Sequence, residues 1–163
     1  MPTRDDHGPV PKQEVVPVHQ SDIQPGRLAV LSDPECWDLL RTRPVGRIAW
    51  SGLQGVSIIP VNYAVSDDSI VLRTTPYSLL ARDSADREVA FEVDDFDVDT
   101  HEGWSVLVRG RCRRVHRATE RPEPWVTGAR VLDLQVEVSS LSGRRILPAA
   151  GHPLQSEDEF FTA

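Results

Sequence analysis

Residues 56–110 of the 163-residue chain constrain its fold most, because short β-branched runs alternate there with turn residues. Such alternation is typical of β-strands with one buried face. Val56–Ser66 and Ile70–Thr75 flank a turn of two aspartates, and Gly103–Val115 is the longest strand signal. The order strand, turn, strand, short helix, strand, strand predicts a small antiparallel barrel that holds an anionic ligand.

The net charge of −7 and the scarcity of lysine narrow the kinds of partner. Non-specific nucleic-acid binding depends on clustered cations, which an acidic chain does not favour. Of the 18 basic residues only Lys12 is a lysine, so we expect an anion site in the folded part to use arginine, backbone N–H groups or hydroxyls. No apolar run is long enough to cross a bilayer, and residues 1–16 lack the apolar core of a signal peptide. We predict a cytoplasmic protein without nucleic-acid or membrane partners.

One folded domain is expected, residues 27–148, between two tails. Residues 1–26 carry five prolines and no hydrophobic period, which predicts a disordered or loosely packed arm. An alternative is that Val15–Val18 adds an edge strand to a partner. Residues 149–163 are predicted to be a flexible acidic tail.

The first helix is predicted to open at Leu31. Ser32–Glu35 reads Ser-Asp-Pro-Glu, a capping box with proline in the first turn, and Pro44 ends the helix. Cys36 in this helix and Cys112 in a strand are expected to be buried reduced thiols rather than a disulfide. The five histidines show no metal-ligand spacing, so no metal site is predicted.

Pro60 interrupts the run Val56–Ser66 and places this strand at an edge or breaks it, because proline cannot donate to a strand ladder. A break leaves backbone groups free for a ligand, which makes Pro60, Val61 and Asn62 a candidate lining. A plain edge bulge is the other interpretation, and the sequence alone favours it.

A second helix is predicted to begin with Tyr77–Arg82 and to end near Ser84 or Ala85. Arg73 and Arg82 would face its N-terminal end, where free N–H groups and the helix dipole favour a phosphate. Pairing of both arginines with surface carboxylates is the alternative, and their spacing does not decide between the two.

The acidic run Asp94–Asp99 follows the predicted strand Glu88–Val93 and is expected to be a solvated loop rather than a cation site. The arginines within Arg109–Arg117 are expected to form a charge-paired surface. Gly110 is predicted to be a bulge or a close approach in the long strand.

Trp125 lies in a proline-rich connector and is expected to pack on the barrel, with capping of a ligand as the alternative. Val131–Val138 alternates cleanly as a final half-buried strand, which Leu141–Ile146 closes.

Six sequence blocks occur in the order that one protein family shows. They are Glu35–Leu40, Val45–Trp50, Pro60–Tyr63, Arg73–Thr75, Val89–Asp95 and Gly103–Gly110. Through them, residues 31–147 resemble the pyridoxamine 5′-phosphate oxidase-like, FMN-binding split-barrel family, and its bacterial flavin proteins in particular. The resemblance implies a mainly β fold, a six-stranded antiparallel split barrel, which dimerises with two FMN sites at the subunit interface.

The resemblance implies that Pro60, Val61 and Asn62 lie along the isoalloxazine ring and that Ser105 reaches it from the long strand. It implies that Arg73, Thr74 and Thr75 approach the ribityl phosphate. Ser78, Arg82 and Trp104 are further candidate cofactor-binding residues.

The chain departs from the family at the start of the second helix. Relatives usually carry Gly-x-Lys there, and the lysine meets the phosphate, whereas this chain has Pro76-Tyr77-Ser78. Loss of one charge-assisted hydrogen bond costs about 1.5–3 kcal/mol, roughly ten- to a hundredfold in affinity. Arg82, on the same helix face as Ser78, is a candidate to compensate.

The resemblance implies a flavin-dependent oxidoreductase that takes a hydride from a nicotinamide donor or a small reduced substrate. The alternative is a protein without turnover: a flavin or deazaflavin carrier, a sensor, or a barrel that has lost its cofactor. No side chain is an obvious acid or base, so no catalytic residue is predicted.

Overall fold

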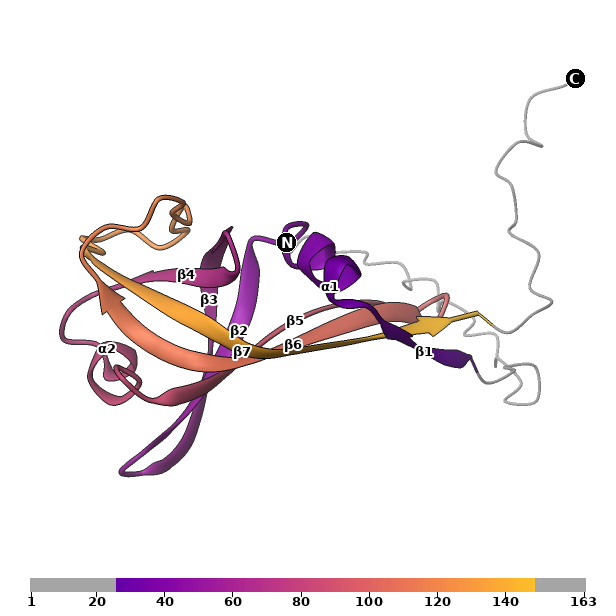
Figure 1. The fold of residues 1–163 in the computed structure, drawn as a ribbon, viewed down its shortest axis with the longest axis horizontal. Coiled ribbons are helices and arrows are strands. Elements are labelled where there is room, and N and C mark those ends of the chain that lie inside the picture. The colour runs from indigo at the N-terminus through magenta and orange to yellow at the C-terminus, as the bar shows by residue number, and fades with distance from the viewer. Residues whose placement is uncertain (1–25, 149–163) are drawn as a thin grey trace, which may run out of the picture.

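The β-branched runs of the sequence form one antiparallel sheet in the computed structural model, which describes residues 26–148. The sheet has seven strands within these residues, and two short helices accompany it (Figure 1). The elements are β1 (Arg27–Leu31), α1 (Asp33–Leu40), β2 (Val45–Gly52), β3 (Gly55–Ser66), β4 (Ser69–Thr74), α2 (Leu79–Asp83), β5 (Glu88–Asp97), β6 (Glu102–Val115) and β7 (Leu132–Leu147).

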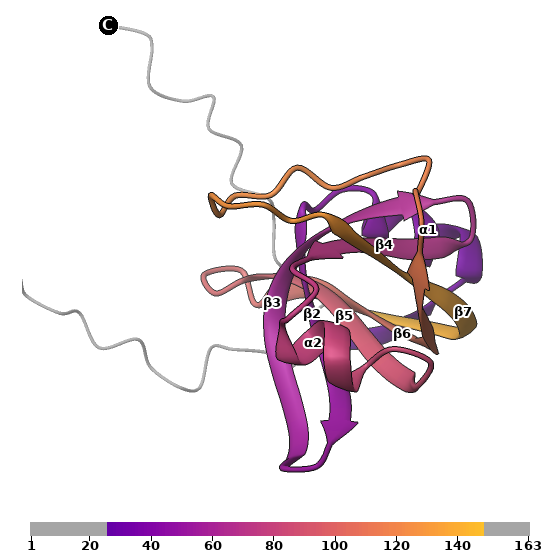
Figure 2. The same ribbon diagram turned by 90° about the vertical axis from the view of Figure 1, so that its left-hand side faces the viewer.

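The sheet closes on itself because β7 pairs with both β4 and β6. Six strands, in the order β7-β4-β3-β2-β5-β6, therefore form a barrel, and β1 pairs with the far part of β7 outside that ring. Figures 1 and 2 show the ring, with α2 at one end and α1 near β1 at the other. The predicted mainly β fold, an antiparallel split barrel of six strands, is confirmed.

Strand β3 changes neighbours along its length. Gly55–Asn62 pairs with β2, whereas Tyr63–Ser66 pairs with β4. Pro60 lies in the first part, where only β2 is hydrogen-bonded to the strand, so a missing N–H on the open side breaks no ladder bond. The predicted edge position of Pro60 is confirmed.

Strand β5 runs further than predicted, through Asp97, so the expected loop Asp94–Asp99 is wrong at its start. The carboxylates of Asp94 and Asp95 form ion pairs with Arg47 and Arg43, and both residues pair with β6. These arginines offset the repulsion between neighbouring carboxylates, which had led us to expect a loop here.

Strand β7 is continuous from Leu132 to Leu147 and joins the predicted strand Val131–Val138 to the closing segment Leu141–Ile146. Strand β6 pairs with it on both sides of the interval and keeps it extended. The register shifts between Arg109 and Gly110, and a Cβ on Gly110 would lie 2.1 Å from the carbonyl oxygen of Glu137. The predicted bulge and close approach are both present.

Helix α1 begins after Ser32, and Leu31 belongs to β1 rather than to the helix. The backbone N–H of Ser32 donates to the Glu35 carboxylate at 2.8 Å, which confirms the capping box. The helix packs on β7 through Cys36, and a Cβ on Gly143 would lie 2.5 Å from its sulfur. Cys36 and Cys112 are buried free thiols, as predicted, and burial raises the pKa of each.

Helix α2 spans only Leu79–Asp83, with Ser78 as its N-cap. Tyr77, predicted to be helical, lies in the preceding turn with its side chain 96% exposed. Within residues 26–148 no helix has the length and apolar character to span a bilayer.

The barrel core contains a tyrosine at the point where β3 changes neighbours. Tyr63 is 5% exposed, its ring meets Phe91 edge-on with centroids 4.8 Å apart, and its hydroxyl donates to the Leu40 carbonyl at 2.5 Å. That bond pairs a carbonyl at the end of α1 and ties the helix to the barrel. Burial raises the pKa of Tyr63 well above its usual range, so it is a neutral donor.

We expect Tyr63→Phe to lower the free energy of unfolding by about 1–3 kcal/mol, because the Leu40 carbonyl is left buried without a donor. Tyr77→Phe is the matched control and should change stability little, since Tyr77 is almost fully exposed. Urea denaturation of both variants measures the difference. Equal stabilities of the two variants would contradict this role of the hydroxyl.

Candidate functional site

The barrel opens where β3 leaves β4. The two strands pair from Ser66 and Ser69 as far as Tyr63 and Leu72, and their pairing stops there. Beyond that point β3 continues beside β2, while β4 continues beside β7. The facing backbone groups of the two strands have no ladder partner there, and groups of this kind bind ligands. We call this part of the molecule the split.

The predicted ring and phosphate contacts of β3 and β4 flank the split. Pro60, Val61 and Asn62 precede the parting on β3, and Arg73 and Thr74 follow it on β4. Residues eleven or more positions apart in sequence are thus brought to one opening by strand register.

The Asn62 side chain is already engaged at both ends. Its Nδ2 donates to the Pro44 carbonyl at 3.3 Å, and its Oδ1 accepts from the Trp125 backbone N–H at 2.9 Å. The amide therefore ties the end of the α1–β2 connection and the segment 116–131 to β3. A ligand at the split meets the backbone of Asn62 more readily than its amide.

Trp125 does not pack on the barrel, contrary to the default expectation. Its side chain is 69% exposed, although its backbone is held by Asn62. The proline-rich connector fixes the main chain here and leaves the large ring in solvent.

Arg73 forms an ion pair with a buried carboxylate on the neighbouring strand. Its Nε donates to Asp133 Oδ1 at 3.2 Å, across a register pair of β4 and β7, and Asp133 is 2% exposed. Arg121 Nη2 approaches the other oxygen, Oδ2, at 2.8 Å, and the Ala118 backbone N–H donates to it at 3.2 Å. We call Arg73, Arg121 and Asp133 the arginine pair cluster.

Sequence reasoning missed Asp133 and Arg121. Asp133 carries no signal, because an acidic residue between Leu132 and Leu134 in an alternating strand is expected on the exposed face. Arg121 carries no signal either, because only the tertiary structure brings the segment 116–131 back over β7.

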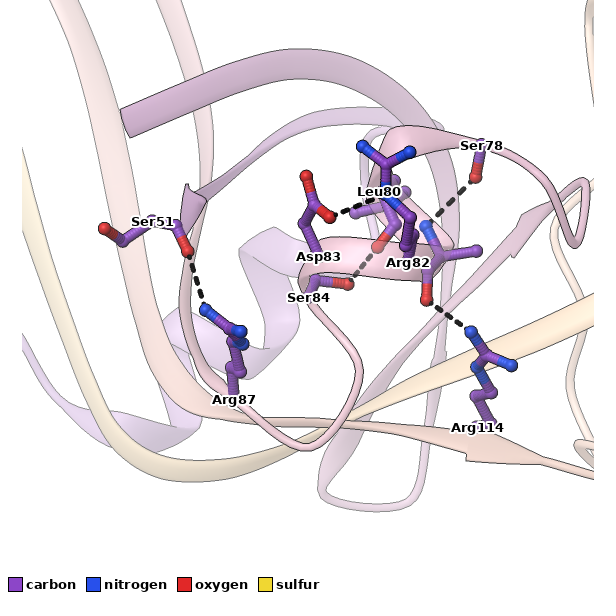
Figure 3. Close-up of polar contacts among 9 residues, drawn as sticks. Ser51, Ser78, Leu80, Arg82, Asp83, Ser84, Arg87 and Arg114 are labelled. Carbon is purple, nitrogen blue, oxygen red and sulfur yellow. Dashed lines mark hydrogen bonds and ion pairs between the residues drawn. The ribbon is translucent and has the colours of Figure 1, made fainter. Parts of the chain in front are cut away.

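Two hydroxyls connect β4 to α2. Thr74, 5% exposed, donates through Oγ1 to the Ser78 hydroxyl at 2.9 Å, and the Ser78 oxygen also accepts from the Ala81 N–H at 3.0 Å. Figure 3 shows Ser78 capping the helix in this way. Ser78 retains one proton to donate, but its oxygen is used in capping.

Arg82 lies in α2 beside Asp83, to which its Nε donates at 2.9 Å (Figure 3). This hydrogen bond raises the pKa of Arg82. The Asp83 carboxylate approaches Gly52 on the β2–β3 hairpin, and Arg87 donates to the Ser51 carbonyl there at 3.5 Å. Arg82 lies in the last turn of α2, and Arg73 and Arg82 each pair with a carboxylate, which is the alternative that the sequence left open. A phosphate contact by Arg82 stays a prediction.

The arginines at the end of β6 are engaged in part with carboxylates, as expected, and in part with backbone carbonyls. Arg113 pairs with Glu137 at 2.8 Å. Arg111 donates to the Asp86 carbonyl at 2.9 Å. Arg114 donates to the Ala81 carbonyl at 2.8 Å (Figure 3).

Trp104 and Ser105 lie on β6, which β2 and β5 separate from β3. Ser105 pairs with Asp94 on β5, and three strand spacings, about 14 Å along the curved sheet, separate β6 from β3. Trp104 borders a different hollow, about 480 Å³ in volume, together with Asp95, Asp97 and Arg145. In residues 26–148 no group of three or more His, Cys, Asp or Glu side chains is placed to hold a metal ion.

A six-stranded barrel that opens between β3 and β4, with arginine and hydroxyl groups on one flank, defines a split-barrel protein. The family model described as pyridoxamine 5′-phosphate oxidase matches residues 32–144, and the chain belongs to that family. This confirms the family resemblance.

This chain is similar to known proteins in sequence and in fold. The FAD-binding protein from Mycobacterium smegmatis is 32% identical, with a TM-score of 0.61, over 73% of this chain and 98% of that one. The conserved protein of unknown function DIP1874 from Corynebacterium diphtheriae is 26% identical, with a TM-score of 0.58, over 74% and 98% of the two chains. The uncharacterized protein Rv0080 of Mycobacterium tuberculosis is 31% identical over 134 residues, 76% of this chain and 88% of that protein.

We expect Asn62→Ala to release the segment 116–131 from β3, because both hydrogen bonds of the amide are lost. Limited trypsin digestion should then cut faster after Arg117 and Arg130, with fragments identified by mass spectrometry. Ser57→Ala, on the same strand, is the control and should not change these rates. Unchanged cleavage in Asn62→Ala would show that the segment is held by other contacts.

Proposed function

We propose that the protein is an FMN-binding oxidoreductase, with the flavin at the split and a homodimer completing each site. The observation that carries this proposal is the parting of β3 and β4, which leaves free backbone groups beside a guanidinium on an otherwise acidic protein. Family membership supports it, as does the 32% identity to a mycobacterial protein described as FAD-binding.

The residues at the split fit a flavin nucleotide. Backbone groups of Pro60–Asn62 suit the polar edge of a planar ring, and the Arg73 side chain, 26% exposed, keeps N–H donors beyond the one that Asp133 uses. Arg73 and the Thr75 hydroxyl would hold the phosphate. A bound flavin would supply the hydride chemistry, and this chain would bind and orient it.

No acid or base is part of the proposal. Among the carboxyl groups, the pKa is lowered at Glu35 by its hydrogen bonds to Ser32 and at Asp97 by backbone N–H groups. Both are helix-cap or turn residues away from the split, and such shifts are structural rather than catalytic.

A second copy of the chain is proposed to complete the site. The outer face of β2, β3 and β5 carries exposed Val56 and Ile58 beside Ala49 and Ala90, around a hollow of about 290 Å³. Contiguous apolar surface of this kind marks protein interfaces. A partner seated there could bring its own Ser105 to the split of this protomer.

We expect Ile58→Asp to convert a dimer to a monomer and to weaken FMN binding, because a charge is placed on the apolar face. Light scattering coupled to size-exclusion chromatography measures the mass. Val98→Asp, at an exposed valine outside this face, is the control. A monomeric wild type, or a dimeric Ile58→Asp that binds FMN normally, would contradict the shared site.

We expect the purified protein to take up FMN and its visible absorption to bleach anaerobically with a nicotinamide donor. Arg73→Ala should lower FMN affinity roughly ten- to a hundredfold, because a charge-assisted hydrogen bond is worth about 1.5–3 kcal/mol. Arg41→Ala, an exposed arginine at the C-cap of α1, controls for the change in net charge. Equal FMN affinity in the wild type and Arg73→Ala would count against the phosphate assignment.

The alternative is a flavin or deazaflavin binding protein without turnover, or a barrel with weakened cofactor binding. It is favoured by the stretch Pro76-Tyr77-Ser78, which brings no ammonium, and by the use of Ser78 as a helix cap. Flavin that binds but stays oxidised with nicotinamide donors would support a carrier or sensor. A protein that ignores both FMN and deazaflavin would support loss of the cofactor.

A further inference from the structure

The arginine pair cluster has more positive charge than its one carboxylate neutralises. Asp133 is 2% exposed, whereas the side chains of Arg73 and Arg121 are 26% and 34% exposed. Both guanidiniums thus rest on a buried anion and keep their outer edges in solvent. With two cations and one anion, the cluster carries a net charge of +1.

Asp133 holds the two guanidiniums in fixed relative positions. Its Oδ1 accepts from Arg73 and its Oδ2 contacts Arg121, so each carboxylate oxygen orients one arginine. The Ala118 N–H also donates to Oδ2, and Pro122, directly after Arg121, is buried. The backbone on both sides of Arg121 is therefore anchored to the barrel.

The remaining guanidinium donors are free to bind an anion. Each arginine has five N–H donors in a rigid fork, and Asp133 engages only a part of them. Two forks held by one carboxylate are pre-organised, so little side-chain entropy is lost when a tetrahedral oxyanion binds.

We propose that Arg121 is a phosphate-binding residue that acts together with Arg73 on the phosphoryl end of the bound flavin nucleotide. This inference rests on the proposed function and assigns the second cation of that site. It explains how the chain manages without an ammonium at Pro76-Tyr77-Ser78: the charge comes from the segment 116–131 rather than from α2. Arg82, whose Nε is engaged by Asp83, is not needed.

The purely structural alternative is that Arg121 only neutralises a buried carboxylate. A buried Asp133 without its partners would be costly, so this alternative predicts lower stability in Arg121 variants and an unchanged choice of ligand. Binding of riboflavin, which lacks the phosphate, separates the two roles.

The experiment is titration of the full-length protein with FMN and with riboflavin, followed by flavin fluorescence. The variant is Arg121→Gln, which keeps a hydrogen-bond donor for Asp133 and removes the charge. We expect its FMN affinity to fall about tenfold or more, with riboflavin affinity unchanged. Arg117→Gln, an exposed arginine in the same segment, is the matched control and should keep the wild-type preference for FMN.

Each outcome decides the inference. If the wild type prefers FMN and Arg121→Gln keeps the full preference, the role of Arg121 is overturned and the proposed function still stands. A wild type that binds FMN and riboflavin equally leaves a ring site but overturns any phosphate contact. A wild type that binds neither overturns the proposed function and this inference together.

A folding defect is separated from a binding defect by thermal denaturation monitored by circular dichroism. Where Arg121→Gln unfolds at the assay temperature, Arg121→Lys serves in its place, since it keeps the charge but not the fork. We expect Arg121→Lys to retain part of the preference for FMN. A folded Arg121→Lys with the preference of the wild type, in more than one salt concentration, would show that fork geometry has no part in recognition.

Discussion

The exchange of neighbours along β3 is the constraint on which the rest of the structure depends. One strand pairs first with β2 and then with β4, so the sheet must open between Asn62 and Arg73. The barrel tolerates this opening because β7 pairs with both β4 and β6 and closes the ring on the other side. The core residue Tyr63 sits at the exchange point and ties it to α1 through the Leu40 carbonyl.

Polar contacts around the split serve both stability and recognition. The Asn62 side-chain amide forms hydrogen bonds with two backbone groups, and the buried Asp133 carboxylate contacts two arginines and a backbone N–H. Buried polar groups of this kind are stable only when fully paired, which makes the surrounding geometry specific. The segment 116–131 is thereby held on β3 through Trp125 and on β7 through Asp133, so it reaches both flanks of the opening.

Placement of the candidate site explains why a single protomer is incomplete in our proposal. The β3 and β4 residues lie together, whereas Trp104 and Ser105 lie on the other side of β2 and β5. An exposed apolar face lies between the two groups. A flavin shared between copies reconciles the positions implied by the family resemblance with this distribution.

The sequence alone determined the strand-rich barrel, the capped first helix, the edge position of Pro60 and the family, because each depends on local pattern or on ordered blocks. It misjudged the acidic end of β5, since cross-strand arginines and pairing with β6 keep that end in the strand. Tertiary structure alone decided that Arg73 shares Asp133 with Arg121. Strand register and the return of a distant segment create that contact, and no local pattern encodes either.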